Sequence, residues 1–111
     1  MTEWVFSYGT LRLPDVQRAT YARLLAGEPD ELPGYRLESL PISNPEVIAM
    51  SGIAEHPVAV PGGARDRVAG VRLALSEAEL QATDLYESAD YVRRPVVLAS
   101  GVEAWIYLAK A

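Results

Sequence analysis

The chain has 111 residues, of which 50% are hydrophobic and 23% charged, so we expect one ordered domain over residues 1–111. A net charge of −5, without any cluster of lysine and arginine, argues against a nucleic-acid partner. Cysteine is absent, which excludes a disulfide framework, a cysteine-ligated metal and a cysteine nucleophile.

The first predicted element is a short, mostly buried strand that ends in a glycine turn. Val5, Phe6 and Tyr8 have high strand propensity, and Gly9 follows them. Because glycine lacks a Cβ, Gly9 can take dihedrals closed to other residues and lets a ligand approach closely. The N–H groups beyond it can form a concave anion site suited to a small carboxylate. The alternative is a plain strand-to-loop turn with Gly9 present for its dihedrals.

A helix is predicted over residues 14–26. Pro14 and Asp15 are typical of a helix start, apolar residues then recur on one helical face, and Gly27 is typical of a C-terminal stop. This helix begins near the glycine turn, so its dipole would add to anion binding there.

Loops and short strands are predicted through the middle of the chain. We expect a polar loop over 28–33, a turn at 33–34, and strands over 35–40 and 47–50. Residues 41–45 are expected to form a loop, whose conformation the sequence does not determine.

Residues 56–66 contain two prolines and two glycines, so we expect a loop or an edge segment there, and a mobile flap. His56 is the single histidine of the chain, so a histidine-rich metal site is excluded. Because it precedes Pro57, we expect it to lie in an extended loop and to be structural or incidental. Residues 67–75 alternate like a strand, with Gly70 where another backbone or a ligand comes close.

A capping box marks the start of a second helix. Ser76 can accept a hydrogen bond from the N–H of Glu79, and the Glu79 side chain can reach back to the cap N–H. We expect this helix to carry Leu80 and Thr83 inward and to end near residues 86–88.

The tail predicts a hairpin, with strands over 91–98 and 102–109 joined at Ser100 and Gly101. The first strand and helix alone resemble a βαβ unit, so a doubly wound parallel sheet is not expected. The order of elements instead predicts an α+β fold: a mixed, curled sheet or small β-barrel with two main helices packed on it.

Carboxylates crowd the end of the second helix, where Asp84, Glu87 and Asp90 oppose the helix dipole. They can pair with Arg93 and Arg94, which is the structural interpretation that we favour for Asp84. A residue that goes against local preference can also be functional.

Glu87 is the candidate for that role because it lies between Tyr86 and Tyr91. If it faces an apolar pocket, desolvation would raise its pKa and make it a usable proton acceptor near neutral pH.

Four short patterns follow one another along the chain: an apolar strand ending in Tyr-Gly-Thr-Leu, a valine and glycine before a strand that runs into a helix, an acidic motif, and a closing Ala-x-x-Tyr. Together they resemble the gamma-glutamylcyclotransferase-like family, in its branch of short bacterial and plant members, over nearly the whole chain. The matching positions are residues 5–12 and 68–80, then Asp84, Tyr86, Glu87, Tyr91, Arg93, Val96, Ala104 and Tyr107.

The resemblance implies an enzyme, a transferase that acts on a small γ-glutamyl amide. The substrate's own α-amine would attack its γ-carbonyl, closing 5-oxoproline and releasing a free amine. By matching position, Glu87 would be the general base and acid. Since the substrate supplies the nucleophile, no cysteine or serine nucleophile is needed. We also expect neither a metal nor a cofactor.

The resemblance also implies two binding roles. The backbone at Gly9, Thr10 and Leu11 would hold the α-carboxylate of the substrate. A tyrosine among Tyr8, Tyr91 and Tyr107 would donate a hydrogen bond to the developing oxyanion.

Three positions depart from the family pattern, because Thr83 stands for leucine, Ser88 for glycine and Leu98 for valine. Ser88 would change how the helix ends and so the direction of Glu87. The Thr83 and Ser88 departures keep open a non-catalytic module that binds a small carboxylate. Removal of a γ-glutamyl protecting group in a biosynthetic pathway is a further alternative. The leaving amine and the oligomeric state are not readable from the sequence.

No apolar run approaches the ~20 residues that span a membrane, and the first three residues lack the basic start of a secretory signal. We therefore expect a cytoplasmic protein with no membrane contact.

Overall fold

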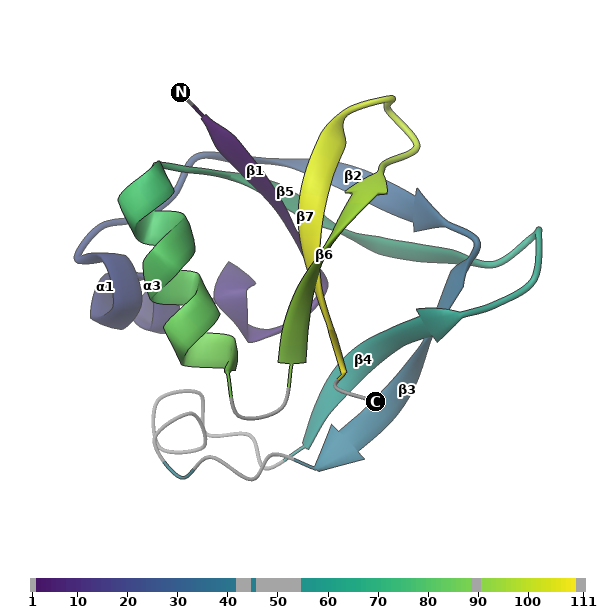
Figure 1. Cartoon of the computed structure of the whole chain (residues 1–111), viewed down its shortest axis with the longest axis horizontal. Coiled ribbons are helices and arrows are strands. Elements are labelled where there is room, and N and C mark those ends of the chain that lie inside the picture. The colour runs from purple at the N-terminus through teal and green to yellow at the C-terminus, as the bar shows by residue number, and fades with distance from the viewer. Residues whose placement is uncertain (1, 42–44, 46–54, 89–90, 110–111) are drawn as a thin grey trace.

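The computed structural model describes residues 2–41, 45, 55–88 and 91–109. The described elements follow an order close to the predicted one: a strand, a helix, several strands, a helix and two strands (Figure 1). The elements are β1 (Glu3–Ser7), the 3₁₀ turn η1 (Thr10–Arg12), α1 (Pro14–Tyr21), β2 (Gly27–Pro33), β3 (Tyr35–Pro41), β4 (Glu55–Pro61), β5 (Arg67–Leu75), α3 (Glu77–Glu87), β6 (Tyr91–Val97) and β7 (Glu103–Ala109).

Five strands form a mixed sheet in the order β2-β5-β1-β7-β6, and β3 and β4 form a second, two-stranded sheet. β1 runs parallel to β7, and the other strand pairs are antiparallel. The large sheet curls, because the N–H of Ala99 in the β6–β7 turn donates to the carbonyl of Glu31 on the edge strand β2 (2.8 Å). The predicted α+β fold, with a mixed and curled sheet carrying two helices, is confirmed.

The central strand β1 is buried on both faces, which explains its apolar sequence. Val5 belongs to one core cluster together with Val16 of α1 and Leu80 of α3. Phe6 points to the other face and belongs to a second cluster with Ala59 of β4. The helices α1 and α3 therefore cover one face of the sheet and the small sheet approaches the other (Figure 1).

The helix α1 ends five residues earlier than predicted, at Tyr21, where Ala22 takes a left-handed conformation with φ 59°. The cause is the side chain of Gln17, which donates to the carbonyl of Leu11 (2.8 Å) and accepts from the N–H of Leu25 (2.9 Å). These bonds turn the chain back over the helix. Gly27 is not a helix stop but the first residue of β2.

The polar loop predicted over residues 28–33 is wrong, because this segment is strand β2, paired with β5 along its whole length. Its sequence is a poor strand former, but it lies at the edge of the sheet, where proline is tolerated. Its charges also have partners across the strands, since Arg72 forms ion pairs with Glu28 and with Asp30. The pairing, rather than local propensity, makes this segment a strand.

Residues 56–66 divide into two parts. The edge-segment alternative holds for β4, which pairs with β3 from Glu55 to Pro61, and residues 62–66 then form the connection to β5. The turn predicted at 33–34 is present, with Gly34 at φ 81°. The flap remains a prediction, and the strand predicted at 47–50 lies outside the described residues.

The second helix and the hairpin are confirmed. Ser76 and Glu79 form the capping box, with hydrogen bonds of 3.1 Å and 2.9 Å, and Leu80 and Thr83 are buried. The β6–β7 hairpin turns at Gly101, whose φ of 89° favours glycine.

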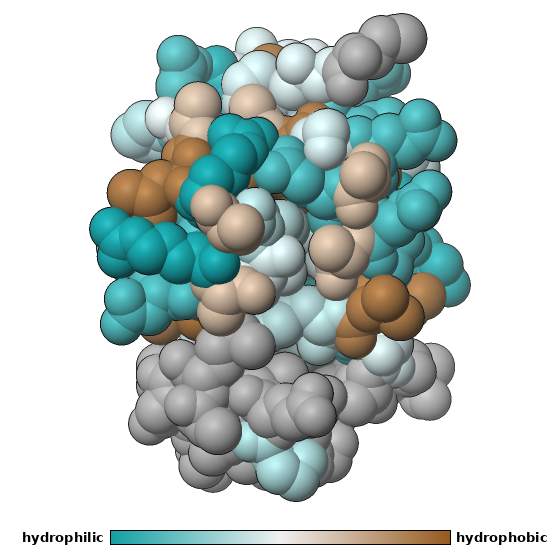
Figure 2. Space-filling model, turned by 90° about the vertical axis from the view of Figure 1, so that its left-hand side faces the viewer, coloured by the Kyte–Doolittle hydropathy of each residue, from teal (hydrophilic) through white to brown (hydrophobic). Residues whose placement is uncertain are grey.

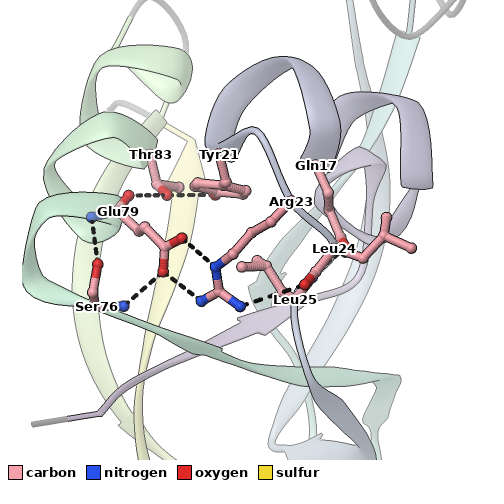
Figure 3. A network of polar contacts seen from close by, with 8 residues as sticks. All are labelled: Gln17, Tyr21, Arg23, Leu24, Leu25, Ser76, Glu79 and Thr83. Carbon is pink, nitrogen blue, oxygen red and sulfur yellow. Dashed lines mark hydrogen bonds and ion pairs between the residues drawn. The ribbon is translucent and has the colours of Figure 1, made fainter.

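A charged clamp holds the start of α3 against the end of α1 (Figure 3). The guanidinium of Arg23 donates two hydrogen bonds of 2.7 Å to the carboxylate of Glu79. This pairing, with the capping box, lowers the pKa of Glu79 to about 2, against 4.5 for an unperturbed glutamate. The folded pKa lies below the unfolded one, so the stabilisation is complete above about pH 4.5 and is lost as the pH falls towards 2.

We therefore expect Glu79→Gln to lower Tm at pH 7 and to have a much smaller effect at pH 2. Glutamine can still complete the capping box, so the difference reports the charge. Thermal melts of both proteins from pH 7 to pH 2 measure it. A Tm difference that is the same at both ends of this range would contradict the assignment.

Candidate active site

One pocket lies where the end of β1 meets the end of α3. Its empty volume is about 320 Å³, part of which is open to solvent. Every residue predicted for the site lines this pocket, together with two that were not predicted. The lining residues are Phe6, Ser7, Tyr8, Gly9, Thr10, Leu11, Glu87, Tyr91 and Tyr107.

Glu87 is the last residue of α3, and its side chain is directed into the protein rather than into bulk solvent. It is 9% exposed. The Ser88 departure does not turn it away: Ser88 ends the helix in a right-handed conformation, and its hydroxyl donates to the carbonyl of Leu85 (2.9 Å). The chain therefore places a carboxylate in the pocket formed by the glycine turn.

The segment from Tyr8 to Leu11 lines the same pocket. In the 3₁₀ turn η1, the N–H of Arg12 donates to the carbonyl of Gly9 (3.3 Å). The N–H groups of Thr10 and Leu11 precede this bond, so they have no partner within the turn. The guanidinium of Arg12 donates to the carbonyls of Tyr8 (3.1 Å) and Gly9 (3.2 Å), which fixes the shape of the segment.

The backbone of Gly9 is neither helical nor extended, with φ −138° and ψ −142°. An added Cβ would meet no atom within 4 Å. Packing within the protein therefore does not require glycine here. The backbone conformation and the approach of a ligand are the two reasons that remain.

Two tyrosines of the pocket, Tyr8 and Tyr107, keep their protons. Burial raises the pKa of Tyr8 to about 12, and burial followed by the Asp84 carboxylate raises the pKa of Tyr107 as well. The hydroxyl of Tyr8 donates to the backbone carbonyl of Tyr107 (2.7 Å), and the hydroxyl of Tyr107 donates to Asp84 (2.7 Å). Both protons are thus already used within the protein. Tyr91 also lines the pocket and is buried.

Asp84 is a structural carboxylate, as predicted. It accepts from Tyr107 and pairs with the guanidinium of Arg93 at 3.1 Å. Among the described residues, Asp84 forms no ion pair with Arg94, whose guanidinium donates to the carbonyl of Arg93 (3.2 Å). Asp90 lies outside the described residues.

The sequence missed Phe6 and Ser7 in the pocket lining and Tyr86 behind it. A hydrogen bond of 2.9 Å joins the hydroxyls of Tyr86 and Thr10, so the glycine turn is tied directly to the helix that ends in Glu87. No signal in the sequence pairs these two residues. The alternation of side chains along β1 places Ser7 and Phe6 on opposite faces, but it does not show that both reach the pocket.

Within the described ranges, no group of three or more acidic side chains lies where it could hold a metal ion. None of the helices described is long and apolar enough to cross a membrane. Figure 2 shows the face over α1 and α3, on which apolar groups are separated by polar surface in the described part. The cytoplasmic location remains a prediction.

The fold and the pocket define an α+β domain in which a buried glutamate faces a glycine turn. The chain belongs to the gamma-glutamyl cyclotransferase, AIG2-like family, whose family model matches residues 5–111. No curated protein matches the sequence.

Solved structures share the fold. A solution structure of an Arabidopsis thaliana protein is 25% identical with a TM-score of 0.76, and it matches 98% of this chain and 62% of its own length. The structure of a gamma-glutamyl cyclotransferase is 16% identical, with a TM-score of 0.72, and the match covers 99% of this chain and 68% of that protein. An uncharacterized Homo sapiens protein is 17% identical, with a TM-score of 0.78 and the same coverages of 99% and 68%. This chain therefore spans less than two thirds of the Arabidopsis protein.

Proposed function

We propose that this protein is a cyclotransferase that acts on a small γ-glutamyl amide. The observation that carries the proposal is the meeting of Glu87 and the segment from Gly9 to Leu11 in one pocket. In the reaction, the substrate's α-nitrogen forms a bond to its γ-carbonyl carbon, and the bond from that carbon to the amide nitrogen breaks. The products are 5-oxoproline and a free amine.

Glu87 would move the proton that this reaction transfers. A carboxylate can take a proton from the α-ammonium group of the substrate and return it to the departing nitrogen. No protein nucleophile is needed, because the attacking nitrogen belongs to the substrate. The protein mainly has to hold the substrate in a folded conformer, and orientation of this kind can supply on the order of 7–11 kcal/mol.

The amides of Thr10 and Leu11 would hold the α-carboxylate of the substrate. They are two consecutive N–H groups without a partner in their own turn, which is the arrangement that binds small anions. A carboxylate held there places the neighbouring amine inside the pocket that contains Glu87.

Two of the three tyrosines considered as hydrogen-bond donors to the oxyanion, Tyr8 and Tyr107, already donate to groups within the protein. Tyr8 and Tyr107 would each have to release an internal acceptor before donating to a substrate oxygen. This counts against both in that role, and it makes them walls of the pocket rather than donors.

Incubation with a panel of γ-glutamyl compounds tests the proposal. We expect release of 5-oxoproline, measured by chromatography, from at least one of glutathione, γ-glutamyl amino acids and γ-glutamyl amines. Saturable binding of 5-oxoproline or glutamate without turnover would support a non-catalytic module instead. Turnover restricted to γ-glutamylated biosynthetic amines would support removal of a protecting group.

Substitution of Gly9 tests the carboxylate site separately from the chemistry. We expect Gly9→Ala to raise KM roughly 10-fold or more, because its methyl group would enter the space over the amides and one good charged contact is worth about 1.5–3 kcal/mol. Tm should stay within about 2 °C of the wild type, since an added Cβ meets no protein atom. Gly63→Ala is the matched control, because a Cβ there also meets no atom closer than 3.6 Å. An unchanged KM in Gly9→Ala would contradict the carboxylate site.

A further inference from the structure

The second half of α3 is tied to three other elements through hydroxyl groups. Thr83, Asp84 and Tyr86 lie within four consecutive residues, just before Glu87. Each forms a hydrogen bond to a different element. Thr83 contacts the hydroxyl of Tyr21 on α1 (2.5 Å), and Asp84 accepts from the hydroxyl of Tyr107 on β7 (2.7 Å). The hydroxyl of Tyr86 contacts that of Thr10 on η1 (2.9 Å).

The contact between Tyr21 and Thr83 is fully buried at its Thr83 end (Figure 3). The Thr83 hydroxyl donates to the carbonyl of Glu79 (2.8 Å), which can only accept. The proton between Tyr21 and Thr83 therefore comes from Tyr21. Burial raises the pKa of Tyr21 to about 12, so this hydroxyl keeps its proton at neutral pH. Thr83, which departs from the family leucine, thus has a specific partner.

These contacts lie on both sides of Glu87 around the helix axis. Successive residues of an α-helix are about 100° apart, so Thr83 is about 40° from Glu87 on one side and Asp84 about 60° on the other. Rotation of α3 in either direction would lengthen one of the two contacts. The direction of Glu87 is therefore set by partners on both α1 and β7.

We infer that Tyr21 is a positioning residue for Glu87: its hydroxyl, held against Thr83, fixes the rotation of α3 and thereby the direction in which Glu87 enters the pocket. Tyr21 is not among the described residues that line the pocket, and its hydroxyl contacts Thr83, so we expect it to act on the chemistry through the helix. The effect on turnover rests on the proposed function, whereas the effect on the position of Glu87 does not.

Tyr21→Phe tests the inference, because it removes one hydroxyl and keeps the ring. We expect kcat for 5-oxoproline release to fall roughly 10- to 100-fold, since a misplacement of about 1 Å costs as much. KM should be unchanged, because the carboxylate site lies elsewhere. Tm should fall by only about 4–8 °C, as expected for one lost hydrogen bond. A crystal structure of the variant should show the Glu87 carboxylate displaced or in two rotamers.

Two further variants sharpen the test. Thr83→Val removes the other end of the contact, so it should reproduce the fall in kcat, and the double variant should be no slower than either single one. Tyr35→Phe is the matched control, since Tyr35 is half-buried on β3 and packs against the other core cluster, and it should leave kcat unchanged.

The two proposals can fail separately. Wild-type kcat in Tyr21→Phe, with Glu87 undisplaced in the crystal structure, would overturn the positioning role and leave the cyclotransferase intact. If the wild-type protein turns over no γ-glutamyl compound, the proposed function fails. The crystal structures then still decide the positioning role, because an undisplaced Glu87 overturns it and a displaced one supports it.

Discussion

Glu87→Gln is expected to lower kcat/KM for 5-oxoproline release by roughly 100- to 10,000-fold, the range that a positioned general acid or base contributes. Glutamine has the same shape as glutamate but cannot accept the proton of the α-ammonium group. It also fits the same buried position at the end of α3. The loss should therefore fall on the chemical step, with KM little changed.

The measurement needs a control that changes a carboxylate without touching the pocket. Glu77→Gln provides it, since Glu77 is exposed in the first turn of the same helix. Circular dichroism should show that both variants keep the fold. If Glu87→Gln releases 5-oxoproline as fast as Glu77→Gln, the proton is moved by another group and the assignment of Glu87 is wrong.

The elements that the sequence predicted well carry their own hydrogen bonds or turn residues. Ser76 and Glu79 cap the helix that they start, and Gly101 takes the positive φ that the β6–β7 turn requires. These contacts join residues that are close in sequence, so they are visible as short patterns. The strand β5 was also predicted with its observed ends, because its alternation is regular.

The elements that were missed depend on distant partners. β2 is a strand because it pairs with β5 and because Arg72 neutralises its charges, neither of which its own sequence shows. The early end of α1 depends on the contacts of Gln17 with Leu11 and Leu25. Intrinsic propensity is a weak predictor wherever such tertiary contacts decide the outcome.

The same division holds for the pocket. Glu87 and the glycine turn were predicted because they stand in motifs that resemble a known family. The residues that hold them in place were not, because Tyr21 meets Thr83 across 62 positions and Tyr86 meets Thr10 across 76. A local pattern identifies the groups in the pocket, but the fold alone shows what fixes their geometry.

Gly70→Ala should be the most destabilising of the substitutions considered, by about 3 kcal/mol or more, as is typical when a packed site must take an extra carbon. Gly70 lies on β5 where β1 ends, and an added Cβ would overlap the backbone oxygen of Ser7 and lie 2.8 Å from Cζ of Phe6. A backbone atom in a central strand cannot move aside as a flexible side chain can. The sequence predicted a close approach at this glycine, and β1 is the backbone that makes it.

The strain would act directly on the pocket, because Ser7 precedes Tyr8 and Gly9 in its wall. We therefore expect Gly70→Ala to lower Tm by about 12 °C or more and to raise KM in the fraction that remains folded. Gly63→Ala, in which the nearest atom is the flexible Asp66 side chain at 3.6 Å, should change Tm by no more than about 2 °C. Equal melting temperatures for the two variants would show that β1 can shift away from β5 without loss of stability. The expected strain on the pocket wall would then be wrong.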